Sequence, residues 1–314
     1  MHYALRDAFP SSCVLAACDI NTTANRIYSH NFPKTQLLQN NIQALSVNKL
    51  DKLQAELWMM SPPCQPFTKK GLRKGIDDHR CDSLMMLMEK LKEMKNRPSF
   101  ILLENVVGFE ESSAHDAVID TLHDLNYGTK ECILSPLQFG VPNSRPRYYL
   151  IASTRFPVRD TAEEISGCFP QESSAEREHI SSFVDASLHT PSLFLDKDVI
   201  QRYGRALDVI IPSSTRSACF TKSYGSYISG CGSYFCDRPD FVCDSRLTNT
   251  ALDNPDNLVE ALRRLSPREV ANLMCFPKDF EVPPDVSDRQ MYQCLGNSIN
   301  VRVVSSILRL LLHS

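Results

Sequence analysis

Several residues with reactive or charged side chains stand where the chain leaves short apolar runs. Cys64 follows Pro62-Pro63, which fix the backbone and remove two amide donors, so its thiol is held on a stiff turn. A free thiol has a pKa of about 8.5, and a cationic neighbourhood raises its thiolate fraction. Cys64 is therefore a candidate nucleophile, with an inert loop cysteine as the alternative.

A carboxylate and two arginines form a second set of candidates. Glu104 directly follows the apolar run Phe100 to Leu103, so we expect burial to raise the pKa of its carboxyl group. Such a group can donate a proton at neutral pH. Arg145 and Arg147 flank a proline that favours an extended backbone, so they are expected to share one face. That face could clamp a carboxylate or a phosphate.

These residues need a scaffold that brings the ends of strands together. The first half of the chain alternates apolar runs with helical patterns, which predicts an α/β fold with a mainly parallel sheet. The expected strands lie in residues 14–20, 57–61, 100–103, 131–134 and 147–152, and the expected helices in 21–32, 83–95 and 113–125. Ligands of such sheets bind beyond the carboxyl ends of the strands, where Asp19 could bind the two hydroxyls of a ribose. Asp19 could equally cap the next helix.

The second half of the chain is less regular. From about residue 153 to 255 the periodicity is lost, which indicates a smaller, irregular lobe. The pattern returns at Ser266-Pro267-Arg268-Glu269, a typical helix start, and residues 298–312 predict an apolar helix that packs back on the first lobe.

Composition limits the classes of protein that fit. The chain has 314 residues, of which 42% are hydrophobic, so a real core is expected, and its net charge of −3 argues against nonspecific coating of nucleic acid. A polyanion would have to meet a local patch such as Lys69, Lys70, Arg73 and Lys74, for which a solvated face is the alternative reading. No apolar run reaches the roughly 18 residues of a membrane span, and no secretory signal is present, so we expect a soluble intracellular protein. Its 12 cysteines lack the paired spacing of a zinc site, which favours reduced, buried thiols.

The order of the motifs resembles that of cytosine carbon-5 methyltransferases. The matching motifs are PPCQPF at 62–67, ENV at 104–106, R-x-R at 145–147, REVANLMCFP at 268–277 and GNSINVRVV at 296–304. The resemblance covers nearly the whole chain and implies a Rossmann-like, S-adenosylmethionine-dependent methyltransferase sheet with a smaller target-recognition lobe. It assigns 1–153 to the catalytic domain, 154–262 to the target-recognition lobe, and 263–314 to helices that return to the catalytic domain.

The resemblance also implies a mechanism. Carbon 5 of cytosine is a poor nucleophile, so the Cys64 thiolate first adds to carbon 6, and a neutral Glu104 places a proton on the ring nitrogen. Arg145 and Arg147 steady the ring carbonyl and the acids of the site. Carbon 5 then takes the methyl group, and loss of its proton expels Cys64. The implied contacts to the methyl donor are Asp19 at the ribose, Ile42 and Gln43 near the adenine, Ser61 beside the nucleophile and Ser298 in the closing helix.

A further triplet points to RNA as the substrate. Cys219, Phe220 and Thr221, followed by Tyr224, resemble the branch that acts on aspartate transfer RNA, which implies cytosine 38 of the anticodon loop. A base in that loop is already partly unstacked, whereas flipping a base out of a duplex costs about a few kcal/mol. We expect RNA contacts in the Lys69 to Arg80 region, DNA as at most a weak substrate, and a monomer in cytoplasm and nucleus. A DNA cytosine methyltransferase and a noncatalytic RNA-binding protein are the alternatives.

One part of the family pattern is missing from the sequence. The family begins with a strand and a glycine-rich turn, aromatic-x-Gly-x-Gly, immediately before the segment that resembles Met1 to Leu5. Without them the neighbouring strands would expose unpaired edges, and the methionine tail of the donor would lose its cradle. We therefore expect this polypeptide to fold marginally and to bind S-adenosylmethionine poorly. A start codon assigned too late and a short, inactive isoform both explain the difference.

Overall fold

The chain forms two compact units. The computed structural model describes residues 1–63, 82–158 and 176–313. The first unit comprises Met1–Leu134, Pro146–Gln171 and Ser305–Ser314, and the second comprises Ser135–Arg145 and Glu172–Val304. This division differs from the three predicted segments, because residues 263–304 belong to the second unit and only the last ten residues join the first.

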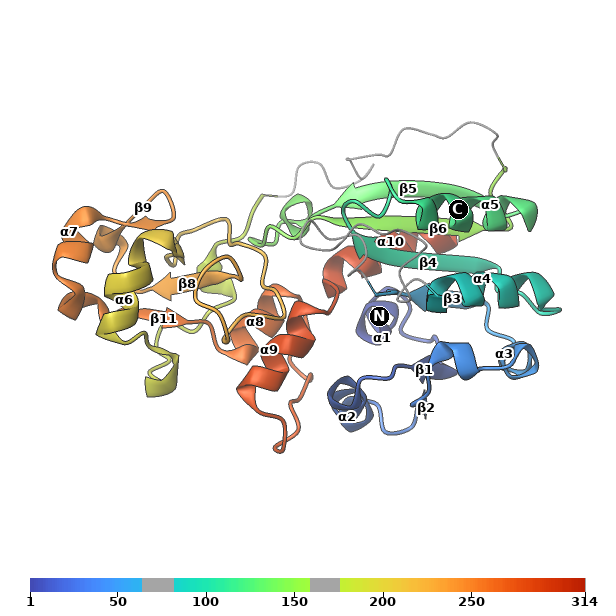
Figure 1. Ribbon diagram of the computed structural model, residues 1–314, viewed down its shortest axis with the longest axis horizontal. Coiled ribbons are helices and arrows are strands. Elements are labelled where there is room, and N and C mark those ends of the chain that lie inside the picture. The colour runs from blue at the N-terminus through green and yellow to red at the C-terminus, as the bar shows by residue number, and fades with distance from the viewer. Residues whose placement is uncertain (64–81, 159–175, 314) are drawn as a thin grey trace. The chain divides into compact units, whose positions relative to one another are not determined.

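The first unit is built on a four-stranded mixed sheet. Its order is β3 (Leu57–Met60), β4 (Phe100–Val106), β6 (Arg147–Ser153) and β5 (Gly128–Leu134) (Figure 1). β3 and β4 run parallel, whereas β6 runs antiparallel to both β4 and β5. The predicted α/β fold is confirmed, and the sheet is less parallel than expected because no crossover helix joins β5 to β6.

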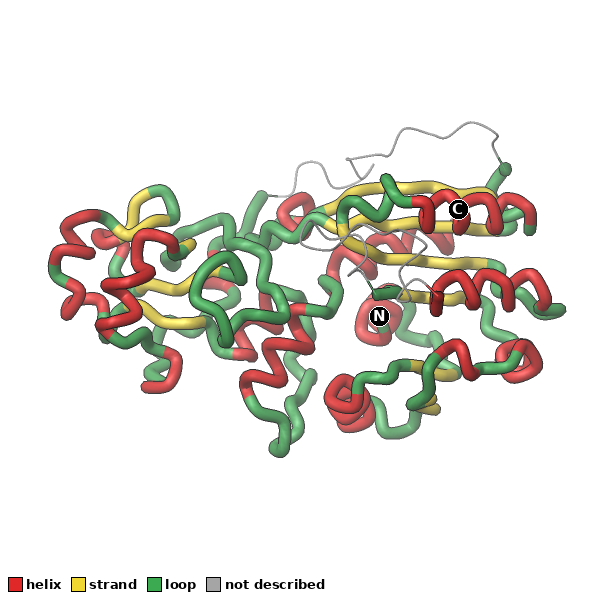
Figure 2. The backbone as a smooth tube through the Cα atoms, in the orientation of Figure 1, coloured by secondary structure: helices red, strands yellow, loops and turns green. Residues whose placement is uncertain are grey.

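The first unit also contains helices of different lengths (Figure 2). They are α1 (His2–Ala8), α2 (Thr22–Asn31), η1 (Ile42–Ala44), α3 (Val47–Leu53), α4 (Asp82–Glu93), α5 (Ser113–Asp124) and the later part of α10 (Val301–His313). The Asn21 side chain accepts a hydrogen bond from the amide of Ala24, and Ser112 caps α5 in the same way. Leu91, Leu103 and Leu122 are buried in the core between helices and sheet.

A second, two-stranded parallel sheet belongs to the same unit. It consists of β1 (Ala16–Cys18) and β2 (Gln36–Leu38), shorter than the predicted strand 14–20. Within the described residues, β1 is hydrogen-bonded only to β2, and β3 only to β4. Among the described strands, β1 and β3 are therefore each hydrogen-bonded along one edge.

The second unit is made of short elements. Its sheet has the order β11 (Leu262–Arg264), β8 (Ser233–Cys236) and β7 (Asp208–Ile210), and β9 (Val242–Cys243) pairs with β10 (Arg246–Leu247). The helices are α6 (Lys197–Tyr203), α7 (Asn249–Asp253), α8 (Pro267–Leu273) and α9 (Asp288–Gly296), with 3-10 turns at 136–139, 180–182, 191–193, 204–206, 239–241 and 255–258. The predicted helix start at Ser266 is confirmed, since Ser266 and Glu269 form a capping box.

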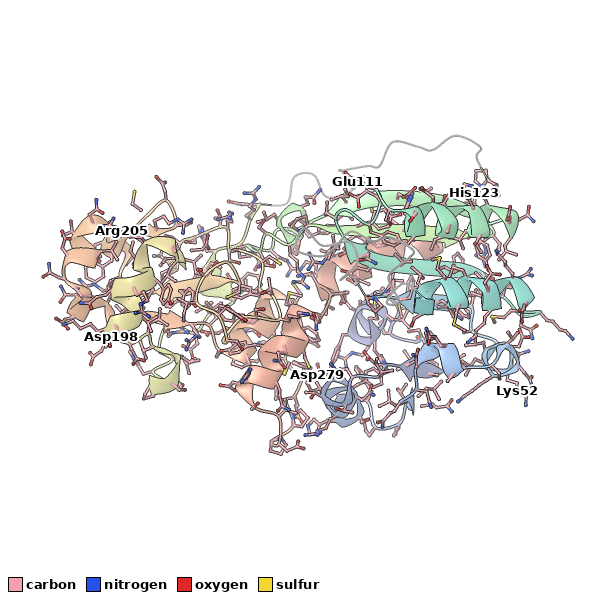
Figure 3. All side chains as sticks on the ribbon, viewed as in Figure 1. Lys52, Glu111, His123, Asp198, Arg205 and Asp279 are labelled. Atoms are coloured by element: carbon pink, nitrogen blue, oxygen red, sulfur yellow. The ribbon has the colours of Figure 1, made fainter. Side chains whose placement is uncertain are left out.

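A buried ion pair lies in the core of the second unit. The Arg263 guanidinium donates to both carboxylate oxygens of Glu269 at 2.8 and 2.9 Å, and the two side chains are only 2% and 3% exposed. Arg263 also donates to the carbonyl of Asp185. By contrast, Lys52, Asp198 and Arg205 are exposed on the surface (Figure 3). No helix in the described part of the chain is long and apolar enough to cross a membrane.

Candidate active site

Glu104 and Arg147 form an ion pair on the sheet of the first unit. In the β4–β6 ladder Glu104 lies opposite Tyr149 and Val106 opposite Arg147, so Glu104 and Arg147 are diagonal neighbours on one face. Arg147 Nε lies 3.3 Å from Glu104 Oε1, and their side chains are 15% and 10% exposed. The strand register, rather than a flexible loop, therefore sets the position of this carboxylate.

Glu104 lies inside β4, so its predicted place directly after the strand is corrected. The strand extends to Val106 because Asn105 and Val106 continue the ladder with β6. Burial of Glu104 favours its neutral form, and the Arg147 guanidinium favours its charged form. The Met1 amino group also faces this carboxylate: burial lowers the pKa of that amino group to about 6, and the charge of Glu104 acts in the opposite direction.

Asn105 beside Glu104 carries a buried polar atom without a partner. The side chain is 1% exposed, and its Oδ1 accepts from the amide of Val106 at 2.8 Å. Within the described residues its Nδ2 has no hydrogen-bond acceptor. Leaving such a donor unpaired costs about 1–3 kcal/mol, and because successive side chains of a strand alternate between faces, this amide lies on the face of β4 opposite Glu104.

Four predicted donor-binding residues lie in the first unit at ends of strands or in a short turn. Asp19 is exposed just after β1, and its Oδ1 accepts from the amide of Asn21 at 2.8 Å. Ser61 is exposed just after β3. Ile42 and Gln43 begin η1, and Lys90 Nζ donates to both of their carbonyls, at 3.1 and 2.6 Å. An accessible carboxylate, an exposed hydroxyl and a fixed turn fit the ribose and the purine of a nucleoside cofactor.

Arg145 lies in the second unit and is occupied by backbone carbonyls. Its Nη1 donates to Phe220 O at 2.9 Å, and its Nη2 donates to Gly296 O at 3.0 Å and Ser298 O at 2.6 Å. The residue is 3% exposed. The prediction that Arg145 clamps a ligand together with Arg147 is therefore corrected, because Arg145 joins the 219–222 segment to the 296–298 turn. Ser298 contributes to this junction through its carbonyl oxygen, which accepts the hydrogen bond from Arg145 Nη2.

The predicted substrate residues of the second unit differ in exposure. Phe220 and Tyr224 are each 1% exposed and contact one another edge to face at 4.9 Å between ring centroids. Their predicted direct contact with RNA is corrected to a packing role, because rings at this depth offer no surface to a substrate. Thr221 and Cys219 are partly exposed, and Arg145 Nη1 donates to the Cys219 thiol at 3.3 Å.

The remaining predicted site residues lie outside the described residues. They are the nucleophile candidate Cys64 and the basic residues Lys69, Lys70, Arg73 and Lys74. Among the residues that the structure does describe, no three metal-ligating side chains come together.

Two further features support the site, and the sequence predicts a role for neither, although Gly296 opens the motif at 296–304. A Cβ atom on Gly296 would lie 2.1 Å from Lys222 N and 2.2 Å from Thr221 C, so this glycine allows two backbones to touch. In the first unit, Glu131 Oε2 accepts from Tyr148 at 2.5 Å and lies 2.6 Å from His115 Nε2. Glu131 and Tyr148 lie on neighbouring strands of the sheet that carries Glu104, and only this strand pairing could have revealed them.

The electrostatics of the His115–Glu131–Tyr148 network favour an ion pair. Burial opposes the charge on His115, but the hydrogen bonds and charges of Glu131 and Asp116 outweigh it and raise the pKa of His115. Burial likewise opposes ionisation of Glu131, but its hydrogen bonds to His115 and Tyr148 prevail and lower the pKa of Glu131. Burial, chiefly, raises the pKa of Tyr148. The network therefore holds a charged pair beneath the strand that carries Arg147.

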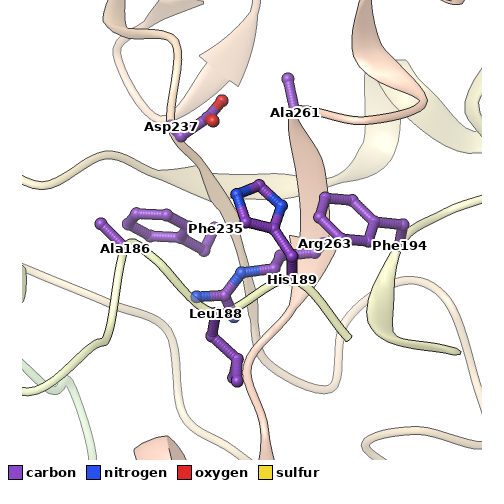
Figure 4. Close-up of a pocket in the computed structure, with 8 residues that line it drawn as sticks. All are labelled: Ala186, Leu188, His189, Phe194, Phe235, Asp237, Ala261 and Arg263. Atoms are coloured by element: carbon purple, nitrogen blue, oxygen red, sulfur yellow. The ribbon is translucent and has the colours of Figure 1, made fainter. Parts of the chain in front are cut away.

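A small pocket in the second unit lies apart from the predicted residues. Its walls include His189, Phe194, Phe235, Asp237 and Arg263 (Figure 4). The His189 ring stacks on Phe194 at 6.0 Å, and Arg263 is already bound to Glu269. None of the predicted site residues lines this pocket, so it is not the candidate active site.

Comparisons with known proteins agree with this geometry. The family model for C-5 cytosine-specific DNA methylases matches residues 1–313. The chain is 37% identical to a tRNA (cytosine(38)-C(5))-methyltransferase from Spodoptera frugiperda, over 99% of this chain and 95% of that protein. It is 32% identical to a DNA (cytosine-5)-methyltransferase from Dictyostelium discoideum, over 99% and 91% of the two chains. The crystal structure of the S. pombe Dnmt2 methyltransferase has a TM-score of 0.83 and 34% identity, and covers 100% of this chain and 94% of its own. The chain thus belongs to the C-5 cytosine-specific DNA methylase family.

Proposed function

We propose that this protein transfers a methyl group to carbon 5 of a cytosine in transfer RNA, with cytosine 38 of aspartate transfer RNA as its target. The observation that carries the proposal is the Glu104–Arg147 pair in a chain that is similar along nearly its whole length to a tRNA (cytosine(38)-C(5))-methyltransferase. A carboxyl group and a guanidinium on one rigid face suit a planar pyrimidine with a ring nitrogen, an amine and a carbonyl.

Each residue has a separate task in this reaction. Cys64 adds as a thiolate to carbon 6 of the cytosine, and Glu104 gives a proton to the ring nitrogen, which makes carbon 5 nucleophilic. Arg147 holds the Glu104 carboxyl group and the ring carbonyl. After methylation, loss of the proton on carbon 5 restores the ring double bond and expels Cys64 as a thiolate. S-adenosylmethionine, when bound by Asp19, Ile42, Gln43 and Ser61, supplies the methyl group.

The first test is methyl transfer to aspartate transfer RNA and, in parallel, to duplex DNA. It uses the purified protein in a form that also carries the strand and glycine-rich turn with which the family begins, because the chain without them is expected to bind the methyl donor poorly. We expect methylated cytosine only in the RNA, and bisulfite sequencing should find it at position 38. Transfer to duplex DNA with none to transfer RNA would favour the second candidate, which the likeness to the Dictyostelium DNA methyltransferase supports. Binding of transfer RNA without transfer to either substrate would leave a noncatalytic RNA-binding protein.

The covalent step has its own test. Transfer RNA that carries 5-fluorocytosine at the target should trap the protein, because fluorine on carbon 5 cannot leave as a proton does. We expect a gel-stable complex with the unmodified chain and none with Cys64→Ala. A trapped complex with Cys64→Ala would remove Cys64 as the nucleophile.

A further inference from the structure

Tyr227 in the second unit is unusually exposed for an aromatic residue. Its side chain is 68% exposed, and no large hydrophobic side chain in the described residues exceeds it. It lies in the segment 218–232, which contains the Cys219-Phe220-Thr221 triplet and leads into β8. A single exposed ring is ordinary in a folded protein, and what distinguishes Tyr227 is the loop that holds it.

The backbone around Tyr227 is fixed although its ring is not packed. The Tyr227 amide donates to Ser223 O at 3.0 Å, and its carbonyl accepts from the Cys231 thiol at 3.1 Å. The next carbonyl, of Ile228, accepts from the Tyr234 hydroxyl at 2.7 Å. The ring is therefore presented from a defined backbone position, and binding a ligand would not have to order this loop.

Tyr224 anchors the same loop to the core of the unit. Its hydroxyl donates to Ser233 O at 2.8 Å and accepts from the amide of Leu265 at 2.9 Å. Its ring lies edge to face against Tyr292 at 5.1 Å. Tyr224 and Tyr227 thus have opposite surroundings. The buried Tyr224 anchors the loop to the core, and the ring of Tyr227 faces solvent.

The charge of the loop favours an anionic partner. The segment 218–233 contains one lysine, Lys222, and no aspartate or glutamate. Lys222 is exposed, and none of the described carboxylates forms an ion pair with it. The loop therefore carries an exposed aromatic ring and a lysine that has no ion-pair partner among the described carboxylates, two features that proteins use to bind single-stranded nucleic acid.

We propose that Tyr227 stacks on an unpaired base of the RNA substrate and that Lys222 contacts a phosphate of the same strand. This inference rests on the proposed function, since it names the part of the RNA that the second unit grips. Stacking accepts any base and requires only that its face be free, which holds in an unpaired loop and fails inside a duplex. Tyr227 thereby selects for unpaired RNA rather than for a particular sequence.

The test compares equilibrium binding of the full chain to two RNAs of equal length, a hairpin with an unpaired loop and a fully paired duplex. We expect Tyr227→Ala to bind the hairpin about 5- to 100-fold more weakly and the duplex unchanged. Tyr227→Phe and Tyr227→Trp should retain hairpin binding, and Tyr227→Leu should lose most of it, because leucine is apolar but lacks a flat π face. Tyr203→Ala on α6, which removes another exposed tyrosine (37% exposed), is the matched control and should have no effect.

Lys222 is tested by salt dependence. Lys222→Ala should lower the slope of log affinity against log salt by about 0.7, the value for one phosphate on a single strand, whereas Tyr227→Ala should leave the slope unchanged. Wild-type affinity of Tyr227→Ala for the hairpin, or an equal loss on both RNAs, would overturn the proposal, as would failure of the unmodified chain to bind the hairpin. Methyl transfer is measured in a separate experiment. A failure of the Tyr227 proposal can therefore be distinguished from a failure of the proposed function.

Discussion

The sheet of the first unit and the 218–232 loop of the second unit hold their polar side chains in different ways. In the sheet, backbone hydrogen bonds between β4 and β6 set the positions of Glu104 and Arg147, and the two side chains pair with each other. Around the loop, side chains replace the missing backbone ladder: Arg145 and Tyr224 bond to main-chain groups on either side. The polar side chains thus pair with each other in the first region and with the backbone in the second.

The largest effect should come from the carboxyl group of the sheet. Glu104→Gln keeps the shape of the side chain but cannot donate a carboxyl proton, so methyl transfer to transfer RNA should fall about 100- to 10,000-fold. The free energy of unfolding should change little, because the ladder does not depend on this side chain. Turnover and urea unfolding measured on the same preparation check both statements. Full activity in Glu104→Gln would show that the carboxyl group of the sheet has no role in the reaction.

Substitution of Arg145 should mainly lower stability, whereas substitution of Arg147 should mainly lower activity. Arg145→Ala leaves three backbone carbonyls without their donor, so the free energy of unfolding should fall by about 3 kcal/mol. Arg147→Ala should instead lower activity and cost less stability than Arg145→Ala, because it removes one ion pair and no bond to a backbone carbonyl of another segment. Arg205→Ala is the exposed control, expected within about 0.5 kcal/mol of the unmodified chain. Equal destabilisation by Arg145→Ala and Arg147→Ala would erase the distinction.

Gly296 tests the close packing behind the loop. Gly296→Ala would place a methyl group against the Thr221–Lys222 backbone, so the loop must move, and we expect a loss of about 1–3 kcal/mol in the free energy of unfolding. Gly230→Ala meets no atom within 4 Å and carries only the strain of its φ of +71°, so it separates backbone strain from crowding. Loss of hairpin binding should accompany Gly296→Ala alone. Wild-type thermal unfolding of Gly296→Ala would show that the loop accommodates the methyl group.

The smallest expected effect is the pH dependence of stability that comes from the His115–Glu131 pair of the first unit. Because the pKa of His115 is raised, the contribution of His115 to the free energy of unfolding is complete below pH 6.5, the ordinary pKa of histidine. This contribution is lost as the pH rises through the pKa of His115 in the folded protein. The lowered pKa of Glu131 means that its contribution is present above 4.5 and is lost as pH falls through its folded pKa. The network should therefore stabilise most between these values, although Asp116, Glu110 and His123 also contribute to its field.

His115→Asn provides the measurement for this network. Urea unfolding between pH 6 and 9 should show that the unmodified chain loses more stability with rising pH than the variant does. Asp116→Asn, which removes an exposed carboxylate next to the same histidine, should change the slope less. Parallel curves for the unmodified chain and His115→Asn would exclude the network as a source of pH dependence.

The sequence could predict the regular parts because their signals are local. The cap at Asn21, the helix start at Ser266 and the apolar run before Glu104 each need only a few neighbouring residues, and the structure contains all three elements. The role of Arg145 could not be predicted, because its acceptors lie 75 to 153 positions away along the chain. The sequence also could not predict that Tyr224 is buried and Tyr227 exposed, because burial depends on packing against residues that are distant along the chain.

The buried Arg263–Glu269 pair constrains how this protein can evolve. Removing one partner strands a charge in the core and costs about 3–5 kcal/mol, whereas replacing both with apolar residues of similar volume can be neutral. Because Glu269 also caps α8 and Arg263 also bonds to Asp185, an apolar exchange must forgo two further contacts. Lineages that carry this pair should therefore keep both residues or change them together, since every single-step intermediate is less fit than either end point.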